Sequence, residues 1–421
     1  MMGVLNHLST LLLLSLLPPA LSHVVKKFSD VPECTEFFLN GSTPNLPGIL
    51  VGGTVQNQGQ NQNRYKPICQ KFNNIYRFAT LYDTFNKIPV FSAYTFTGPP
   101  TGPRRAKRPK EQKEKSISRH WKIEPQLEDE NINIEEMNFQ SGVKEMLNNN
   151  KVLVNQAVNT DYVKSGLHKG HLFPCSHAPD DDTKRSTCTL TNAVPQNQNF
   201  NQGRWKAMEG NVRETLVENC KNNNNKIEAY VVTGAVPNNN NNQLNHRVNI
   251  PDLMWTAFCC ENNLGQWVAG AHWGENQKED QKKTLPSYTL AELYDKLNER
   301  YGDGVQLFPD QCLRDDIPTE LLLKDGGDEQ DHCDYVPTEE PLIKNTCPCP
   351  PRKRVCNPGD VGGGVKRMKF QKRDIPTELL LKDGGDGHDH CVYDDDCVCS
   401  SVGVKGYYLP VVFVSVLVMM M

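Results

Sequence analysis

Two histidines and a lysine surround one glycine in the stretch SGLHKGHLFP, residues 165–174. The imidazole of His171 titrates near neutral pH and can therefore act as a general base. The ammonium of Lys169 can neutralise the charge of a phosphate. The stretch alone does not separate this chemistry from a metal site or from an ordinary polar loop.

Zinc binding is an alternative use of the same stretch, because imidazole and thiolate are both zinc ligands. The spacing of the candidate ligands, H-x2-H-x3-C-x-H, is not one of the common zinc patterns. A cysteine of a secreted chain is also expected to be oxidised. Both facts disfavour zinc at His168, His171, Cys175 and His177.

A segment about thirty residues further along carries polar groups at four-residue spacing. From Asn201 onward the chain contains good helix formers and no proline, which predicts a helix. Side chains four residues apart drift slowly around one side of a helix. In a purely structural helix, Trp205 would be a core residue, and Glu209 and Arg213 would form an ordinary ion pair.

Together these residues supply what phosphodiester hydrolysis needs. A base must activate water, a cation must absorb negative charge, and a basic side chain must lie nearby. Magnesium prefers oxygen ligands and keeps several waters, so a single asparagine carbonyl can be its main anchor. His171, Asn201 and Glu209 provide a base, that anchor and a carboxylate that can hold the waters.

The order of the motifs resembles that of the DNA/RNA non-specific endonucleases, a family of ββα-metal nucleases. The motifs are K-G-H-L-x-P at 169–174, T-N-x-V-P-Q at 191–196 and N-Q-G-x-W-x-x-M-E at 201–209. The resemblance covers about residues 30–312, the expected endonuclease domain. It implies the α+β class and a ββα-metal (His-Me finger) fold, with a mixed or antiparallel central sheet flanked by helices. It places His171 at a strand end and Asn201 on the helix that crosses the strand.

The resemblance also implies an activity and the residues that carry it. The family cleaves DNA and RNA with little base preference, uses Mg²⁺ (Mn²⁺ being another candidate cation) and leaves 5′-phosphates. By this resemblance His171 is the general base, Asn201 the metal ligand and Glu209 the residue that orients metal-bound water. Arg213 helps to offset phosphate charge, and Asn192 supports the site. Backbone contact without base readout needs only positive side chains, for which the chain offers Lys169, Arg204, Lys206 and Arg213.

One motif departs from the family pattern D-R-G-H, because this chain has His168 and Lys169 in its first two positions. Lysine keeps the positive charge but loses the bidentate grip of arginine on phosphate. An imidazole cannot accept the hydrogen bonds that a carboxylate accepts. We therefore expect a reduced activity or a shifted pH optimum. The alternative function is a nuclease fold that binds nucleic acid or a partner without effective cleavage.

Both ends of the chain are apolar. Residues 1–22 have the features of a secretory signal peptide, with a short apolar run, a Pro-Pro pair and small residues near Ser22. In an exported chain the 15 cysteines are expected to form disulfides, and because their number is odd at least one is free or bonded to another molecule. It also makes Asn40, in NGS, a candidate glycan acceptor. Residues 407–421 form either an anchor signal for the membrane or a tail without function.

The composition between these ends separates a core domain from two polar segments. The chain is 37% hydrophobic, which is enough for a core, and its net charge of −4 gives no global sign of a nucleic-acid binder. Residues 98–118 form a basic insert whose composition predicts an exposed loop. Residues 313–406 contain DIPTELLLKDGGD twice and predict a weakly structured, cysteine-rich tail. Its C-x-C spacings favour disulfides over zinc.

The core region shows strand and helix patterns. Leucines at helical spacing after Thr289 predict a helix over 289–302 that ends at Gly302. Asparagine runs are expected at loop tips. Apolar runs rich in β-branched and aromatic residues predict strands, at 87–98, 226–237, 247–260 and 265–273.

Overall fold

The structure of the 421-residue chain is a computed structural model. It describes residues 23–56, 63–99, 121–147, 152–278 and 284–313. All of them belong to the first of two units into which the chain divides, Met1–Val336. Most of the basic insert, the repeated tail, the C-terminal apolar segment and the predicted signal peptide lie outside the described residues.

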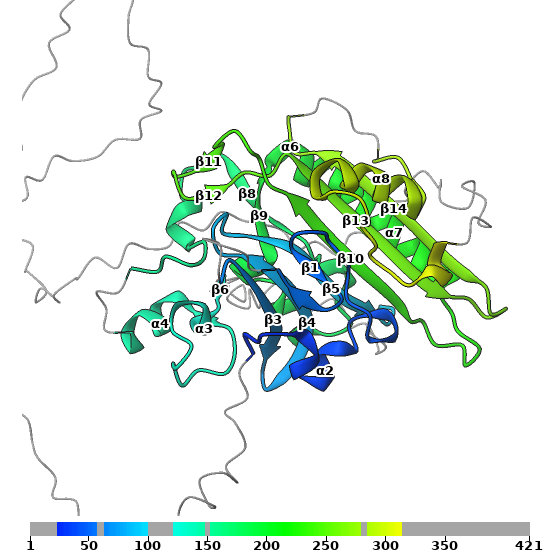
Figure 1. The fold of residues 1–421 in the computed structure, drawn as a ribbon, viewed down its shortest axis with the longest axis horizontal. Helices are drawn as coiled ribbons and strands as arrows, with labels where there is room; N and C mark the ends of the chain where they lie inside the picture. Colours follow the sequence, from blue (N-terminus) through cyan, green and yellow to red (C-terminus); the bar gives the residue numbers. More distant parts are fainter. Residues whose placement is uncertain (1–22, 57–62, 100–120, 148–151, 279–283, 314–421) are drawn as a thin grey trace, which may run out of the picture. The chain divides into compact units, whose positions relative to one another are not determined.

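A six-stranded antiparallel sheet forms the centre of the described part of the chain (Figure 1). The strand order is β14-β13-β10-β5-β4-β3, and each neighbouring pair is antiparallel. Because β5 pairs with β10, the sheet joins the two halves of the domain. The strands are β3 (Tyr65–Phe72), β4 (Ile75–Asp83), β5 (Ile88–Phe96), β10 (Ala229–Val236), β13 (Leu253–Glu261) and β14 (Trp267–Glu275).

The strand predictions are confirmed at β5, β10 and β14 but wrong for the run 247–260 as one strand. Its first residues form β12 (Val248–Asn249), which pairs with β11 (Gln243–Leu244), and β13 starts only at Leu253. Pro251 lies between them and has no N–H for a ladder, so it interrupts the run. The overall content of helices and antiparallel strands is that of the expected α+β class.

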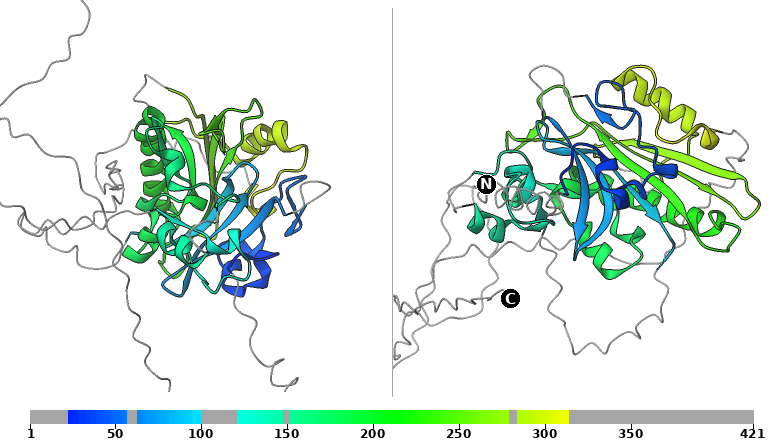
Figure 2. Two further views of the ribbon diagram at one scale, coloured as in Figure 1. Left: turned by 90° about the vertical axis from the view of Figure 1, so that its left-hand side faces the viewer. Right: turned by 60° about the horizontal axis from the view of Figure 1, so that its bottom comes forward.

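Two helices cover opposite faces of the sheet, α7 (Lys206–Asn219) on one face and α8 (Leu290–Tyr301) on the other. The left view of Figure 2 shows them in green and yellow on the two sides of the strands. Successive side chains of a strand point to opposite faces. In β10, Val231 therefore packs in the core under α7, and Val232 packs in the core under α8.

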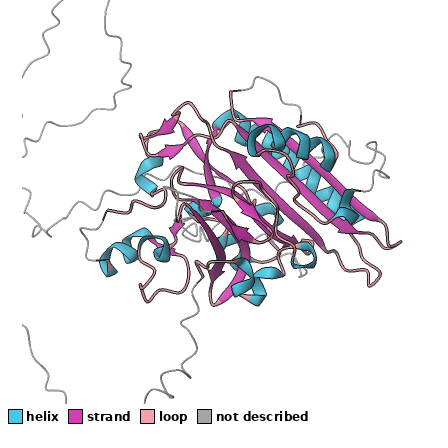
Figure 3. Ribbon diagram, viewed as in Figure 1, coloured by secondary structure: helices cyan, strands magenta, loops and turns pink. Residues whose placement is uncertain are grey.

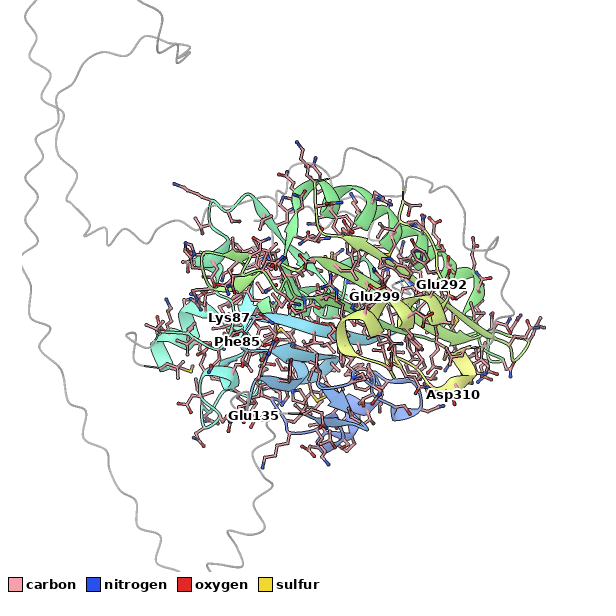
Figure 4. The ribbon with its side chains drawn as sticks, turned by 45° about the horizontal axis from the view of Figure 1, so that its top comes forward. Phe85, Lys87, Glu135, Glu292, Glu299 and Asp310 are labelled. Atoms are coloured by element: carbon pink, nitrogen blue, oxygen red, sulfur yellow. A yellow bond between two sulfur atoms is a disulfide. The ribbon has the colours of Figure 1, made fainter. Side chains whose placement is uncertain are left out.

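Helix α8 begins and ends where its sequence predicts. Thr289 Oγ1 accepts a hydrogen bond from the N–H of Glu292, and the Glu292 carboxylate accepts one from the N–H of Thr289. This reciprocal cap satisfies amides that the helix leaves unpaired. Glu292 lies on the exposed side of the helix (Figure 4), and Gly302, with φ of 87°, follows its last turn. Three buried leucines occupy the predicted spacing: Leu290, Leu293 and Leu297.

Shorter elements complete the described fold (Figure 3). The short helices are α2 (Pro32–Thr35), α3 (Pro125–Glu128), α4 (Gln140–Met146), α5 (Asp181–Ser186) and α6 (Gln198–Phe200). The short strand pairs are β1 (Leu50–Val51) with β2 (Thr54–Val55), β6 (Lys122–Ile123) with β7 (Asn138–Phe139), and β8 (Leu167–His171) with β9 (Ala193–Asn197). None of the helices in the described ranges is long and apolar enough to cross a membrane.

The expected disulfides are present in the described part of the chain, as Cys34–Cys69, Cys220–Cys260 and Cys259–Cys312. Cys259 and Cys260 are adjacent in β13, so their side chains leave opposite faces of the sheet. Cys260 bonds to Cys220, at the C-terminal end of α7. Cys259 bonds to Cys312, in the short helix that follows α8. Each face of the sheet is thus covalently tied to its own helical layer.

Candidate active site

The strand pair β8 and β9 carries the first two motifs. Side chains alternate along β8, so His168 and Gly170 lie on one face, and Lys169 and His171 lie on the other. The first face is buried and the second is half-buried. His171 is the last residue of β8, at a strand end as the resemblance implies.

The pairing of these strands requires glycine at position 170. A Cβ at Gly170 would lie 2.0 Å from Oε1 and 2.7 Å from Cβ of Gln196. Real Cβ atoms essentially never approach other atoms this closely. Gln196 is fully buried and cannot simply swing into solvent. The glycine of the first motif therefore makes room for the glutamine of the second.

Asn192 fixes the chain directly after His171. Its Oδ1 accepts hydrogen bonds from the N–H of Phe173 and from Oγ of Ser92, both at 2.9 Å. Its Nδ2 donates to the carbonyl oxygens of Phe173, at 3.1 Å, and Thr187, at 2.9 Å. The buried amide thus joins the segment after β8 to β5 of the central sheet.

The helix expected from Asn201 is irregular at its start. The π-helical segment η7 (Asn201–Trp205) lies between α6 and α7, and Gly203 leaves the helical region at φ −101°, ψ −111°. Such π turns occur frequently at functional sites. Asn201 and Trp205 therefore do not share a regular α-helical spacing. Trp205 is a buried core residue, and its ring centroid lies 5.6 Å from that of Phe200.

Asn201 contacts His168, which stands where the family pattern has aspartate. Nδ2 of Asn201 lies 3.0 Å from Nδ1 of His168. An amide nitrogen can only donate, so this imidazole nitrogen accepts and carries no proton. Burial lowers the pKa of His168, which also favours the neutral ring. This hydrogen bond engages only Nδ2 of Asn201. Its Oδ1 is the atom of the side chain that can bind a cation.

His171 lies on the other face of β8, next to two residues from outside the motifs. Its ring centroid lies 4.8 Å from that of Trp121, with the ring planes inclined by 42°. Its Nε2 lies 3.7 Å from Sγ of Cys188, within reach of a weak hydrogen bond. The sequence does not predict that Trp121 or Cys188 lies beside His171. Neither residue belongs to a motif, and only the fold brings them there.

Lys169 shares this face with His171. Its Nζ donates to Oδ1 of Asn159 at 2.8 Å. The same Nζ lies 5.5 Å from the ring centroid of Trp121 and 5.4 Å from that of Tyr162. Aromatic faces attract cations, so this position favours the charged ammonium. His171 and Lys169 therefore meet at one indole ring.

Glu209 is a carboxyl group with an unusual proton affinity. It borders a small cavity of about 10 Å³, also lined by Tyr94 and Trp205, which is about the space that one water needs. Burial raises the pKa of Glu209 to about 8, against the effects of the Trp205 indole and the Lys206 ammonium. This group therefore changes its charge near neutral pH.

A buried histidine holds the helical turn of Glu209 against the sheet. Nε2 of His177 lies 2.9 Å from the backbone oxygen of Glu209, and its Nδ1 lies 2.8 Å from Oη of Tyr94 in β5. A carbonyl can only accept, so Nε2 donates to it and Nδ1 accepts from the tyrosine. Burial lowers the pKa of His177 to about 4, so the ring stays neutral at physiological pH.

The two arginines proposed to bind substrate lie on different turns. Arg204 belongs to η7, close to Asn201 in the chain, and is partly exposed. Arg213 lies near His177, whose pKa its charge helps to lower. It lies about two turns into α7, which begins at Lys206, and is therefore further along the helix than Arg204. The charges acting on Glu209 do not include Arg213, so the ordinary ion pair considered from their spacing does not form.

A hydrated divalent cation fits the residues present better than zinc does. The described ranges contain no group of three His, Cys, Asp or Glu side chains that could hold a metal. A hard cation that keeps most of its waters needs no such cluster, and Oδ1 of Asn201 supplies an oxygen ligand. His168 and His171 leave opposite faces of β8 and cannot share one ion, and Cys175 is in a disulfide. The zinc alternative is therefore not supported.

The chain matches a known protein family over more than half of its length. Residues 57–308 match the family model described as DNA/RNA non-specific endonuclease. The chain is similar to the Endonuclease domain-containing 1 proteins of Homo sapiens, 31% identical over 294 residues, and Mus musculus, 30% identical over 295 residues. Each alignment covers 69% of this chain and 50% of the relative, so the chain spans about half the length of the curated relatives it matches. A chain in the crystal structure of the EndoG/EndoGI complex is similar at 17% identity and a TM-score of 0.39, covering 57% of this chain and 86% of that chain.

Proposed function

This chain belongs to the DNA/RNA non-specific endonuclease family, and from that premise we propose that it hydrolyses the phosphodiester bonds of DNA and RNA with little sequence preference, using Mg²⁺ or a similar cation. The arrangement on β8 carries the proposal. One face of the strand presents Lys169 and His171, and the other face contacts Asn201 at the start of η7. A phosphate at the end of β8 would meet the base and the ammonium on one face, and Asn201 would hold the cation from the neighbouring face of the same strand.

His171 is the proposed general base. It takes a proton from the attacking water while Asn192 holds the chain that follows it. His171 is the last residue of β8 and is half-buried, which supports its use as a base at the edge of the strand. Transfer to a positioned base of this kind typically accelerates a reaction by about 10²–10⁴-fold. Lys169, held by Asn159 on the same face, offsets the growing charge of the phosphate.

The remaining roles belong to the helix. Asn201 would hold the cation through Oδ1, and the bound cation would supply charge stabilisation at the phosphate. Arg204, in the same π-helical segment, contacts the nucleic-acid backbone near the cleaved bond, and Arg213 contacts it further along. Glu209 borders a cavity about the size of one water, which supports a role in holding water rather than in binding substrate.

The proposal includes secretion. The composition of residues 1–22 supports export, and three disulfides in the described chain are typical of an oxidising compartment. Attachment to a membrane through residues 407–421 is a further proposal. Release of the protein from intact cells by a phosphatidylinositol-specific phospholipase would support it, and recovery of all the protein in the medium without enzyme would contradict it.

A second function, binding without effective cleavage, is favoured by one observation. His168 accepts the hydrogen bond of Asn201 where the family pattern has a carboxylate. A neutral imidazole brings no negative charge to the neighbourhood of a cation. Under this alternative, the protein binds nucleic acid with a steep salt dependence but leaves it intact.

Plasmid nicking by the full-length secreted protein tests the proposed function. We expect cleavage in Mg²⁺, none after chelation by EDTA, and a loss of about 10²–10⁴-fold in His171→Ala. His246→Ala is the matched control, because His246 is an exposed histidine in a turn, and it should cut as the wild type does. Equal cutting by His171→Ala would refute the assignment of the base. Salt-dependent binding with no cutting by the wild type would favour the second function.

A further inference from the structure

Trp121 contacts both proposed reactive side chains on the half-buried face of β8. It immediately precedes β6 and is only 6% exposed. Its ring centroid lies 4.8 Å from that of His171 and 5.5 Å from Nζ of Lys169. One indole thus touches both the proposed base and the proposed phosphate-binding cation, although Trp121 is far from their motif in the sequence.

Hydrogen bonds to the backbone of Trp121 and of the next residue hold the indole in place. Nδ2 of Asn159 donates to the carbonyl oxygen of Trp121 at 3.2 Å, and Oδ1 of the same Asn159 accepts from Nζ of Lys169 at 2.8 Å. One asparagine side chain therefore couples the position of the tryptophan to that of the lysine. Trp121 is also part of the hydrophobic core on the α7 side of the sheet.

Lys122, the residue after Trp121, ties the same segment to Arg185 and Cys188. The N–H of Lys122 donates to the carbonyl oxygen of Cys188 at 2.9 Å, and its buried Nζ donates to the carbonyl oxygen of Arg185 at 2.8 Å. Cys188 is the residue whose Sγ lies beside Nε2 of His171. Trp121 and Cys188 therefore both border the His171 imidazole. The backbone of Lys122 joins them, because it follows Trp121 in the chain and donates a hydrogen bond to Cys188.

We propose that Trp121 is a positioning residue for the endonuclease reaction, holding the His171 imidazole and the Lys169 ammonium in place and favouring their positive charges through its ring. This inference rests on the proposed function. Stacking on a nucleobase, another common use of an exposed tryptophan in nucleic-acid binding, is incompatible with a side chain that is 6% exposed. Trp121 acts through His171 and Lys169 and does not touch the substrate.

The physical effect follows from the charge that His171 acquires. When the base takes a proton from water, its ring becomes a cation, and a nearby aromatic face stabilises that cation. The same face holds Lys169 charged and in place before the substrate arrives. Loss of the ring should therefore lower kcat through His171 and raise KM through Lys169.

The test compares three variants of the full-length protein. Trp121→Leu removes the aromatic face and Trp121→Phe keeps one. Phe258→Leu removes another buried aromatic ring of the same core, which lies in β13, away from β8. We expect Trp121→Leu to lower kcat about fivefold and to move the acid limb of the pH–rate profile down by about half a unit. Trp121→Phe should restore most of both effects. Phe258→Leu should lower the stability to urea while leaving the acid limb unmoved.

An activity-independent measurement separates failure of this inference from failure of the proposed function. The imidazole of His171 is titrated by NMR, with the His171→Ala spectrum used to assign its signal. We expect the titration midpoint to fall in Trp121→Leu and to return towards the wild-type midpoint in Trp121→Phe. An unchanged midpoint in Trp121→Leu overturns the inference, whether or not the protein cuts DNA. A changed midpoint in a protein without nuclease activity refutes the catalytic role but confirms the control of His171.

Discussion

His168 and His171 are three positions apart, yet their surroundings give them different chemistry. His168 is buried, accepts a hydrogen bond from Asn201, and has a lowered pKa because of its burial. His171 is half-buried and contacts Trp121 and Cys188. The alternation of β8 produces this difference, since an odd step along a strand reverses the face. Of the two, His171 is the less buried, which suits its proposed role as the base better than that of His168.

Replacement of His168 by aspartate tests the effect of the altered motif. An aspartate can accept the hydrogen bond from Nδ2 of Asn201 as the imidazole does, and it adds a negative charge beside the cation ligand. We expect His168→Asp to raise the Mg²⁺-dependent kcat/KM by about tenfold, the size of effect typical of groups that support a metal ligand. It should also lower the Mg²⁺ concentration needed for half-maximal cleavage.

His168→Asn is the matched control for this gain, because its amide oxygen accepts a hydrogen bond without bringing a charge. We expect no increase in kcat/KM for this variant. An equal gain in His168→Asn and His168→Asp would show that the charge is not the cause.

The raised pKa of Glu209 predicts a pH-dependent stability. The carboxyl has a folded-state pKa of about 8 against an ordinary value of 4.5, so between these values the folded protein holds a proton that the unfolded chain releases. Stability therefore falls as pH rises through this window and stays lower above it. Glu209→Gln should be more stable than the wild type at pH 9 by roughly 2 kcal/mol, less than the full shift implies because the side chain is partly exposed.

Urea unfolding at pH 5 and pH 9 measures this difference. Glu214→Gln is the control, because Glu214 is an exposed carboxylate on the same helix, and its stability should follow that of the wild type. If the stability of Glu209→Gln depends on pH as steeply as that of the wild type, Glu209 is not the group responsible.

At the scale of secondary-structure elements, the site depends on a missing side chain in β8 and on an irregular turn before α7. β8 and β9 pair closely because Gly170 has no side chain to collide with Gln196. The helix after β9 begins with the π-helical segment η7, which brings Asn201 to His168 and then continues as α7 with Trp205 buried at the junction. A bulkier residue at position 170 would prevent the first contact, and a regular helix from Asn201 onward would change the second.

Gly170→Ala should disrupt the strand pair. The added methyl group would overlap Gln196, so we expect a loss of about 3 kcal/mol in the free energy of unfolding, together with a loss of nuclease activity. Gly210→Ala is the matched control, since nothing lies within 4 Å of a Cβ there and the residue is inside α7. That substitution should stabilise the protein by about 1 kcal/mol. Wild-type stability in Gly170→Ala would show that Gln196 can move out of the way.

At the scale of the whole described domain, the central sheet separates two hydrophobic cores. The site belongs to the α7 side, with Trp121, Leu172 and Trp205 in its core. The other core contains the α8 leucines and the N-terminal segment around Phe28. The adjacent cysteines of β13 tie one helical layer to each face. Changes on the α8 side should therefore affect stability more than chemistry.

Removal of each disulfide tests this separation. The bonds Cys220–Cys260 and Cys259–Cys312 have sequence separations of 40 and 53, so each should contribute about 4 kcal/mol by the chain-entropy model. We expect both double alanine variants to lose similar stability in urea. Only the loss of Cys220–Cys260, at the end of α7, should lower kcat at a temperature where both variants are folded. An equal loss of kcat in both would contradict the separation of the two layers.

The sequence by itself determined the features that depend on neighbours in the chain. Apolar runs predicted β5, β10 and β14, and Thr289 with Gly302 predicted the ends of α8, because periodicity and capping are local. The order of the three motifs was enough to indicate the family and to choose His171 and Asn201 as candidates. Their roles in catalysis stay predictions for the experiments above.

Only the tertiary structure decided which groups surround these candidates. The contact of Asn201 with His168, the indole of Trp121 beside His171 and Lys169, and the thiol of Cys188 beside the imidazole all join distant segments. Such contacts arise when strands and helices pack, and no local pattern encodes them. The four-residue spacing of Asn201 and Trp205 was similarly misleading, since a π-helical turn changed their relation. The sequence thus determined which chemistry was available, and packing decided which face of β8 presents it.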